Sequence, residues 1–308
     1  MPATDGPLPE LLGFETAWFD LPGLRMHAAA AGPTDGPLVL LLHGFPEFWY
    51  SWRHQIGPLA RAGFRVLAPD QRGYNLTGKG GPYDVATLAE DVVHLLAALG
   101  RRRACVAGHD WGAAVAWTLA ALHPERVERL AVLNVPHPAV MARALRFGSL
   151  RQMRRSLYIF LFQLPRVPEW LLSRNEYGRL RWLLRASSRR GTFTAQDIDR
   201  YREAWSRPGA LRASLGWYRA LARTVLAPRG ARVGRIGVPT LIVWGERDAA
   251  LGVELAERSV RMADDVSLVR FPQATHWVHE DLPEEISRLL LEHFAGGPGP
   301  HQATGGLQ

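Results

Sequence analysis

The sequence is nearly devoid of cysteine and lysine. Among its 308 residues Cys105 is the only cysteine, so the chain cannot form an internal disulfide, and we expect a cytoplasmic protein. Its first residues lack a basic stretch followed by an apolar one, so no secretory signal is predicted. Apolar runs stay far below the roughly 20 residues that a membrane helix needs, so we predict no membrane span.

Acidic residues are scarce in one part of the chain. Residues 138–232 hold 20 arginines and 5 acidic residues, whereas acidic residues outnumber basic ones in the remainder. Such a basic segment can attract anions or nucleic acid. Its arginines, however, recur at the spacing of solvated helix faces, and Lys79 is the only lysine among 37 basic residues. We therefore interpret the charge as compositional bias and expect no nucleic-acid binding.

Signatures of cofactor and metal sites are missing as well. The glycines around Lys79 do not open a helix after a strand, as a dinucleotide-binding loop would require. Histidines and acidic residues do not occur at the spacing of metal ligands. The sequence therefore predicts no cofactor and no metal.

What the sequence does contain is an alternation of apolar strands and amphipathic helices. Such alternation is typical of an α/β fold, with a mostly parallel sheet flanked by helices. The predicted strands are 14–20, 24–31, 38–42, 64–68, 127–133, 239–245 and 266–271. A further short strand is predicted at the apolar start of residues 103–114. The predicted helices include 51–62, 85–99, 253–262 and 283–294.

The alternation breaks between residues 137 and 232, where the pattern is helical and rich in arginine and aromatic residues. This block is too long for a simple crossover between two strands, so we predict an inserted helical cap (lid) domain at 137–232. Residues 1–136 and 233–295 then form the core domain. The Gly/Pro-rich residues 296–308 are predicted to be a disordered tail.

The most informative stretch is Gly108-His109-Asp110-Trp111-Gly112, which follows an apolar strand and precedes a helix. It has the layout of a nucleophile elbow, with aspartate where serine is better known. Small neighbours suit such a turn, because the backbone passes close to itself. Taken alone, the stretch could also be a strand–helix loop whose aspartate caps the helix.

Polar residues at three strand ends favour the elbow. Asp110, Asp248 and His276 each follow a predicted strand, and ligands of α/β sheets bind beyond the carboxyl ends of the strands. The order nucleophile, acid, histidine is that of the α/β-hydrolases. We therefore predict a catalytic triad of these residues. His279 is a weaker candidate for the base, since it stands beside an expected helix start.

An aspartate nucleophile indicates the reaction. A carboxylate is ionised at neutral pH and can displace a leaving group at an sp³ carbon, which leaves an alkyl ester on the enzyme. His276, oriented by Asp248, would activate the water that cleaves this ester. The cleavage needs an oxyanion hole, for which we predict the backbone N–H groups of Phe45 and Trp111.

Four motifs resemble those of the α/β-hydrolase-fold epoxide hydrolases. They are the elbow itself, His43-Gly44-Phe45-Pro46-Glu47 with the following Trp49-Tyr50-Ser51-Trp52-Arg53, Asp70-Gln71-Arg72-Gly73-Tyr74, and Thr275-His276-Trp277. The resemblance covers roughly residues 14–295. It implies two cap tyrosines that hydrogen-bond the epoxide oxygen, matched here by Tyr158 in Tyr158–Pro165 and Tyr218 in Trp217-Tyr218-Arg219.

Two other functions remain open at this point. Haloalkane dehalogenases share the aspartate elbow and use a tryptophan like Trp111 to bind halide, but they often carry asparagine where this chain has Phe45. A non-catalytic binding protein on a hydrolase fold is the third reading, although such proteins usually lose the nucleophile or the histidine. Serine esterase activity is disfavoured, since the elbow has no serine.

The sequence thus predicts an epoxide hydrolase that makes a vicinal diol from a small apolar epoxide and water, as a monomer or homodimer. His43 and His109 are expected to make structural hydrogen bonds. An apolar substrate pocket is predicted, lined by Phe45, Pro46, Trp49, Trp52, Trp111, Phe162 and Trp277.

Overall fold

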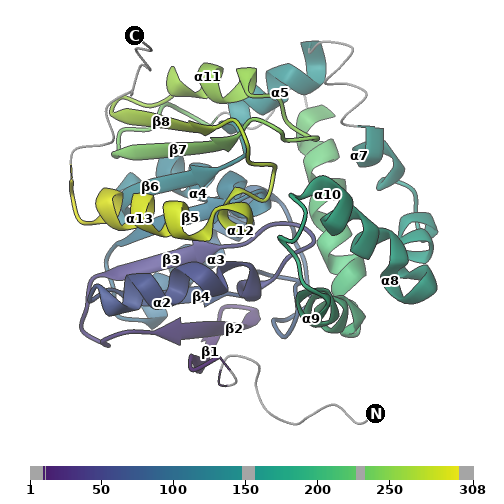
Figure 1. The fold of residues 1–308 in the computed structure, drawn as a ribbon, viewed down its shortest axis with the longest axis horizontal. Coiled ribbons are helices and arrows are strands. Elements are labelled where there is room, and N and C mark those ends of the chain that lie inside the picture. The colour runs from purple at the N-terminus through teal and green to yellow at the C-terminus, as the bar shows by residue number, and fades with distance from the viewer. Residues whose placement is uncertain (1–9, 11, 148–156, 227–232, 298–308) are drawn as a thin grey trace.

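A computed structural model describes residue 10 and residues 12–147, 157–226 and 233–297 (Figure 1). Most of the predicted tail therefore lies outside the described residues. An eight-stranded sheet forms the centre of the molecule, with strands in the order β1-β2-β4-β3-β5-β6-β7-β8. The strands are β1 (Glu15–Leu21), β2 (Leu24–Ala31), β3 (Leu38–Leu42), β4 (Arg65–Pro69), β5 (Ala104–His109), β6 (Val127–Leu133), β7 (Thr240–Gly245) and β8 (Val266–Phe271).

Pairing within the sheet confirms the predicted α/β-hydrolase fold with its mostly parallel sheet. β1 and β2 form an antiparallel hairpin, and β2 also runs antiparallel to β4. From β4 to β8 all neighbours are parallel. The central strands β3, β5 and β7 are buried along their whole length, which explains their uninterrupted apolar sequences. The edge strand β1 alternates between more and less exposed side chains.

Helices cover both faces of the sheet. On one face α3 packs against α4, and on the other α2 packs against α13 (Figure 1). The Asp84 carboxylate caps α3 by accepting the Thr87 N–H, at 3.1 Å. The helices and helical turns outside the insertion are η1 (Trp49–Trp52), α2 (Arg53–Arg61), α3 (Val85–Ala98), α4 (Trp111–Leu122), η2 (Pro124–Arg126), α11 (Glu254–Val260), α12 (Val278–Asp281) and α13 (Pro283–Phe294).

Between β6 and β7 the chain forms a group of helices that we call the helical insertion. It consists of α5 (Pro138–Phe147), α7 (Leu157–Leu161), α8 (Val167–Ser187), α9 (Ala195–Ser206) and α10 (Ala210–Leu226). α8 and α10 both contact α9, and the group lies beside one edge of the sheet (Figure 1). A capping box between Thr194 and Asp197 begins α9. The cap boundaries at 137 and 232 stay a prediction.

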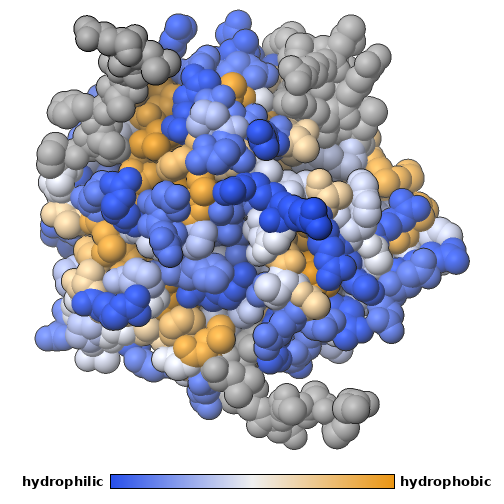
Figure 2. Space-filling model, viewed as in Figure 1, coloured by the Kyte–Doolittle hydropathy of each residue, from blue (hydrophilic) through white to orange (hydrophobic). Residues whose placement is uncertain are grey.

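Differences from the predicted elements are small and fall at element ends. The helix expected at 51–62 is a 3-10 turn, η1, followed by α2. The helix expected at 253–262 shortens to Glu254–Val260. Polar residues dominate the face shown in Figure 2, with smaller apolar areas between them. Within the described ranges, no helix combines the length and apolar character of a membrane span.

Candidate active site

The predicted elbow is present as a strand, a sharp turn and a helix. β5 ends at His109, Asp110 adopts φ 48° and ψ −121°, and α4 begins at Trp111. A positive φ is strained for a residue with a side chain, so the surrounding structure must hold it. Space is made by glycines: a Cβ on Gly112 would lie 2.0 Å from the Leu42 carbonyl oxygen, and one on Gly44 would lie 2.3 Å from the Asp110 Cβ. The elbow therefore presents the Asp110 carboxylate above the sheet.

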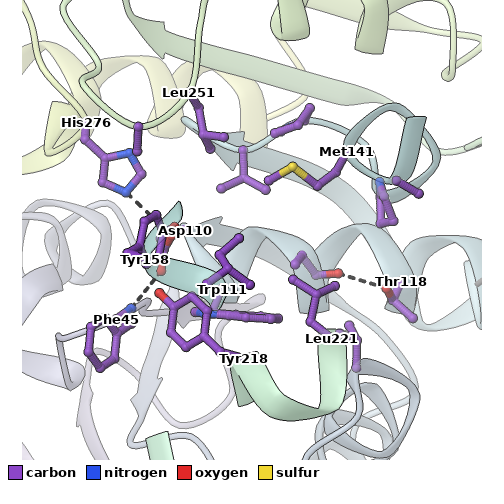
Figure 3. A pocket seen from close by; sticks show the side chains of 18 of the residues that line it. Phe45, Asp110, Trp111, Thr118, Met141, Tyr158, Tyr218, Leu221, Leu251 and His276 are labelled. Carbon is purple, nitrogen blue, oxygen red and sulfur yellow. Dashed lines mark hydrogen bonds and ion pairs between the residues drawn. The ribbon is translucent and has the colours of Figure 1, made fainter. Parts of the chain in front are cut away.

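His276 lies between the two aspartates that the sequence singles out. Its Nε2 is 3.5 Å from Asp110 Oδ2 (Figure 3), and its Nδ1 is 2.7 Å from Asp248 Oδ2. Three strand ends far apart in sequence thus meet at one edge of the sheet. His276 faces the elbow, whereas His279, the weaker candidate, is fully buried and its ring lies against Trp52.

The Asp248 carboxylate accepts hydrogen bonds from other groups in addition to His276. Its Oδ2 accepts the Asn134 amide at 2.8 Å, and its Oδ1 accepts the N–H groups of Ala250 and Leu251 at 2.7 and 2.9 Å. Burial opposes ionisation of Asp248, but the charge and hydrogen bond of His276 outweigh burial and lower its pKa. Burial likewise disfavours the cationic His276, but Asp248 and Asp110 raise its pKa well above the ordinary value.

One of the two predicted oxyanion-hole donors already contacts the nucleophile. The Phe45 N–H donates to Asp110 Oδ1 at 2.8 Å (Figure 3). Asp110 Oδ1 is thus engaged by the backbone, while Oδ2 faces His276. The Trp111 N–H stands at the first position of α4, where helix amides are free of intrahelical partners. Its role as the second donor stays a prediction.

Tyr158 of α7 and Tyr218 of α10 come together on the side of the insertion. Their ring centroids are 5.8 Å apart. The Tyr218 ring also meets the rings of Trp111 and Phe45, at 5.0 and 5.3 Å. Burial, followed by the negative charge of Asp110, raises the pKa of Tyr158 above its ordinary value. Both phenols therefore stay protonated and able to donate.

A cavity of about 1080 Å³ separates the sheet edge from the helical insertion. Its wall includes Asp110, His276, both tyrosines, and four of the predicted pocket residues, namely Phe45, Trp111, Phe162 and Trp277. Figure 3 shows the two tyrosines beside Asp110 on this cavity. Apolar surface dominates the wall, as expected for a site that binds an apolar molecule.

Three predicted pocket residues lie elsewhere, which corrects the predicted lining. Trp49 and Trp52 are fully buried in the core, where Trp49 packs edge-on against Phe14. Both belong to η1, whose tight turn directs their side chains into the interior rather than toward the cavity. Pro46 is part of a small separate pocket beside Trp205, whose indole N–H donates to the Pro46 carbonyl.

Behind the elbow the fold assembles a buried cluster that sequence spacing did not reveal. Glu47, His109 and His279 bring one ligand atom each to within 4.8 Å of one another, as a metal site would require. Both His109 ring nitrogens are already hydrogen-bonded, to Glu47 Oε2 and to the His276 carbonyl oxygen, each at 2.8 Å. His109 and His43 thus make the predicted structural hydrogen bonds. These hydrogen bonds indicate that the cluster stabilises the loop that carries His276.

Glu47 and Asn134 are site residues that the sequence analysis did not assign. Glu47 Oε2 accepts the Gly44 N–H at 2.9 Å and so fixes the loop that carries Phe45. Burial opposes its ionisation, but the charge and hydrogen bond of His109 hold the pKa of Glu47 well below its ordinary value. Asn134 adopts a positive φ at the end of β6. Its signal in the sequence was the same as that of Asp110: a polar residue directly after a buried strand.

Comparisons with known proteins agree with this geometry. A family model described as the alpha/beta hydrolase fold matches residues 37–283. The AB hydrolase superfamily protein YfhM of Bacillus subtilis is 43% identical over 285 residues, covering 92% of this chain and 98% of that protein. Epoxide hydrolase 4 of Mus musculus is 36% identical, covering 87% of this chain and 76% of its own.

A solved structure shows the same similarity in three dimensions. The epoxide hydrolase of Bacillus megaterium, crystallised with an inhibitor, superposes with a TM-score of 0.82 at 28% identity, covering 91% of this chain and all of that one. Family model, relatives and structure therefore agree over nearly the whole described chain. The chain belongs to the α/β-hydrolase-fold family of the epoxide hydrolases.

Proposed function

We propose that this protein hydrolyses an epoxide to a vicinal diol in two steps, through an ester on Asp110. In the first step Asp110 Oδ2 attacks a ring carbon and the C–O bond of the epoxide breaks. The ring oxygen leaves as an alkoxide that takes a proton from Tyr158 or Tyr218. Two phenols are suitable donors, because their raised pKa values keep them protonated until the alkoxide forms.

In the second step water attacks the carbonyl carbon of the ester. His276 Nε2 accepts a proton from this water, while the 2.7 Å hydrogen bond to Asp248 fixes the tautomer of the ring. The negative charge on the carbonyl oxygen forms at Asp110 Oδ1, beside the Phe45 N–H. Collapse of this intermediate breaks the bond between the carbonyl carbon and the alkyl oxygen, and His276 gives its proton to that departing oxygen. The proton left on the Asp110 carboxylic acid returns to the tyrosine phenolate, so that both groups regain their starting state. The diol leaves with an oxygen that belonged to Asp110.

The two tyrosines are the observation that favours an epoxide over a haloalkane as the substrate. The triad of Asp110, His276 and Asp248 alone would serve a haloalkane dehalogenase equally well, because that reaction forms the same kind of ester. A departing halide needs N–H donors and no proton, whereas an opening epoxide needs an acid. Tyr158 and Tyr218 border the cavity beside Asp110, and Phe45 occupies the position where dehalogenases often have asparagine. The arrangement favours epoxides.

The test offers wild-type protein and Asp110→Asn both styrene oxide and a primary haloalkane. Wild type is expected to form diol and release no halide. Removing the nucleophile is expected to lower epoxide turnover by at least about 10⁴-fold, and Asp110→Ala, which lacks a carbonyl group, should do the same. Halide release without diol would identify a dehalogenase. Binding of either compound without any turnover would favour a non-catalytic protein.

A further inference from the structure

The cavity extends far beyond the reacting groups, along one side of α4. Trp111, Ala114, Thr118 and Leu122 all border it, and their spacing of three, four and four residues places them on one helix face. At 1.5 Å per residue this row spans about 16 Å. Figure 3 shows Thr118 on the side of the cavity away from His276. A three-carbon epoxide would fill only the end at Asp110.

The opposite wall of this extension is mostly apolar, although the cavity lining also includes Arg146 of α5 and Asp84, which caps α3. It is formed by Pro138 and Met141 of α5 and by Leu221 of α10, with Val135 at the end of β6. Thr118 contributes a hydroxyl group, but that group donates to the Ala114 carbonyl oxygen at 2.8 Å and so needs no acceptor on a ligand. The extension therefore suits a hydrocarbon chain, which would desolvate few polar groups there.

The far end of the row reaches solvent. Leu122, the last residue of α4, is 48% exposed, and Ala86 in the first turn of α3 is exposed as well. Both border the cavity, and α3 lies against the end of α4, where the side chains of Glu90 and His123 are 2.8 Å apart. A chain longer than the row would thus continue into water instead of meeting a closed wall.

We propose that the preferred substrates are epoxides at the end of a long aliphatic chain, which lies in the channel along α4 between Ala114 and Leu122. This inference rests on the proposed function. Thr118 sits midway along the channel, seven residues or about 10 Å from Trp111, and so controls which chain lengths are accepted. Specificity should rise with chain length while the chain lies inside the channel and level off once it emerges.

Kinetics on a series of terminal epoxides test the channel, from butene oxide through octene and dodecene oxide to hexadecene oxide. For wild type, kcat/KM should rise by up to about fourfold per added methylene group over the first part of the series and then become constant. Thr118→Phe should leave butene oxide within twofold and lower dodecene oxide at least tenfold. Leu221→Phe, at a half-buried position across the channel, should act in the same way.

Val167→Phe is the matched control, because Val167 is an exposed residue of α8 outside the cavity wall. It should change no substrate more than twofold. A wild-type kcat/KM that stays flat or falls from butene to dodecene oxide would overturn the inference. So would variants that lower all substrates equally.

Binding of unreactive alcohols separates this inference from the proposed reaction. Trp111 and Trp277 line the cavity, so a change in tryptophan fluorescence when the alcohol is added reports that the cavity is occupied. Dodecanol should bind wild type at least tenfold more tightly than it binds Thr118→Phe, and butanol should bind neither measurably. This result without any epoxide turnover would sustain the channel and remove the proposed reaction. Equal binding of dodecanol to both proteins would remove the channel.

Discussion

Individual side chains at the site divide into those that the sequence revealed and those that it did not. Asp110, Asp248 and His276 follow strands that are easily recognised, and the carboxyl ends of parallel strands must meet. Their convergence was therefore predictable. The positions of the Trp49 and Trp52 side chains were not predictable, because the direction of a side chain in a one-turn helix depends on how that turn is packed.

At the residue scale the sharpest prediction concerns the two phenols. Tyr158→Phe and Tyr218→Phe keep the rings but remove the proton donors, and the double variant should lower the rate of ester formation by roughly 10²-fold or more. The rate of ester hydrolysis should change little, because the phenols act only on the departing alkoxide. Stopped-flow fluorescence of Trp111 and its neighbours would separate the two steps.

Tyr177→Phe controls for the loss of a hydroxyl group as such. Tyr177 lies in α8 against Trp205, with ring centroids 5.9 Å apart, and is not part of the cavity wall. Its substitution should leave both steps within twofold of wild type. Undiminished ester formation in the double variant would show that another group, or water, protonates the epoxide oxygen.

At the scale of elements, buried charges join the helical insertion to helices that flank the sheet. Arg53 of α2 bonds Glu280 of α12 at 2.6 Å and approaches Asp197 of α9 at 3.2 Å. Tyr50 and Tyr201 donate to the same two carboxylates. This network links α9 of the insertion to η1 and α2 and to α12, the short helix that follows His276. A sequence shows the charges but not which of its many arginines is buried, so the network was not predictable.

Removing Arg53 should therefore destabilise the protein strongly. In Arg53→Met, Glu280 and Asp197 stay buried without their cation, and we expect the free energy of unfolding to fall by about 3–5 kcal/mol. Urea denaturation followed by tryptophan fluorescence measures this change. Arg288→Met breaks an exposed pair with Glu292 and should cost less than about 0.5 kcal/mol. Similar small losses for both variants would contradict a structural role for the network.

At the scale of the whole molecule, the fold encloses the proposed catalytic groups between the sheet and the insertion. This arrangement was predictable as a plan, from the helical block between two strands, but the cavity's shape was not. It depends on how α5 and α10 pack over α4, and side-chain types alone do not define that packing.

Enclosure makes the charges of the site depend on one another, which predicts a particular pH behaviour. In the free enzyme Asp248 and Asp110 both raise the pKa of His276. Esterification removes the charge of Asp110, so the pKa of His276 should drop in the intermediate. Neutral His276, the base in the proposed reaction, is present above its pKa and is lost as the pH falls through that pKa. Ester hydrolysis should therefore slow in acid, with a midpoint below the His276 pKa of the free enzyme.

NMR titration of His276 in the free protein and single-turnover rates between pH 5 and 9 would give the two values. Accumulation of the ester in acid is the accompanying expectation. If the two midpoints coincided, Asp110 would have no influence on the histidine, and the short path from Asp110 through His276 to Asp248 would lose its assigned role.

The covalent ester is the centre of the account, and a single turnover in ¹⁸O-labelled water tests it most directly. Excess enzyme is mixed with an epoxide, and the peptide containing Asp110 and the diol are both weighed by mass spectrometry. Hydrolysis of the ester places the labelled oxygen in the Asp110 carboxylate and leaves the first diol unlabelled. Label in the diol, with none in Asp110, would mean that water opens the epoxide directly and would contradict the account.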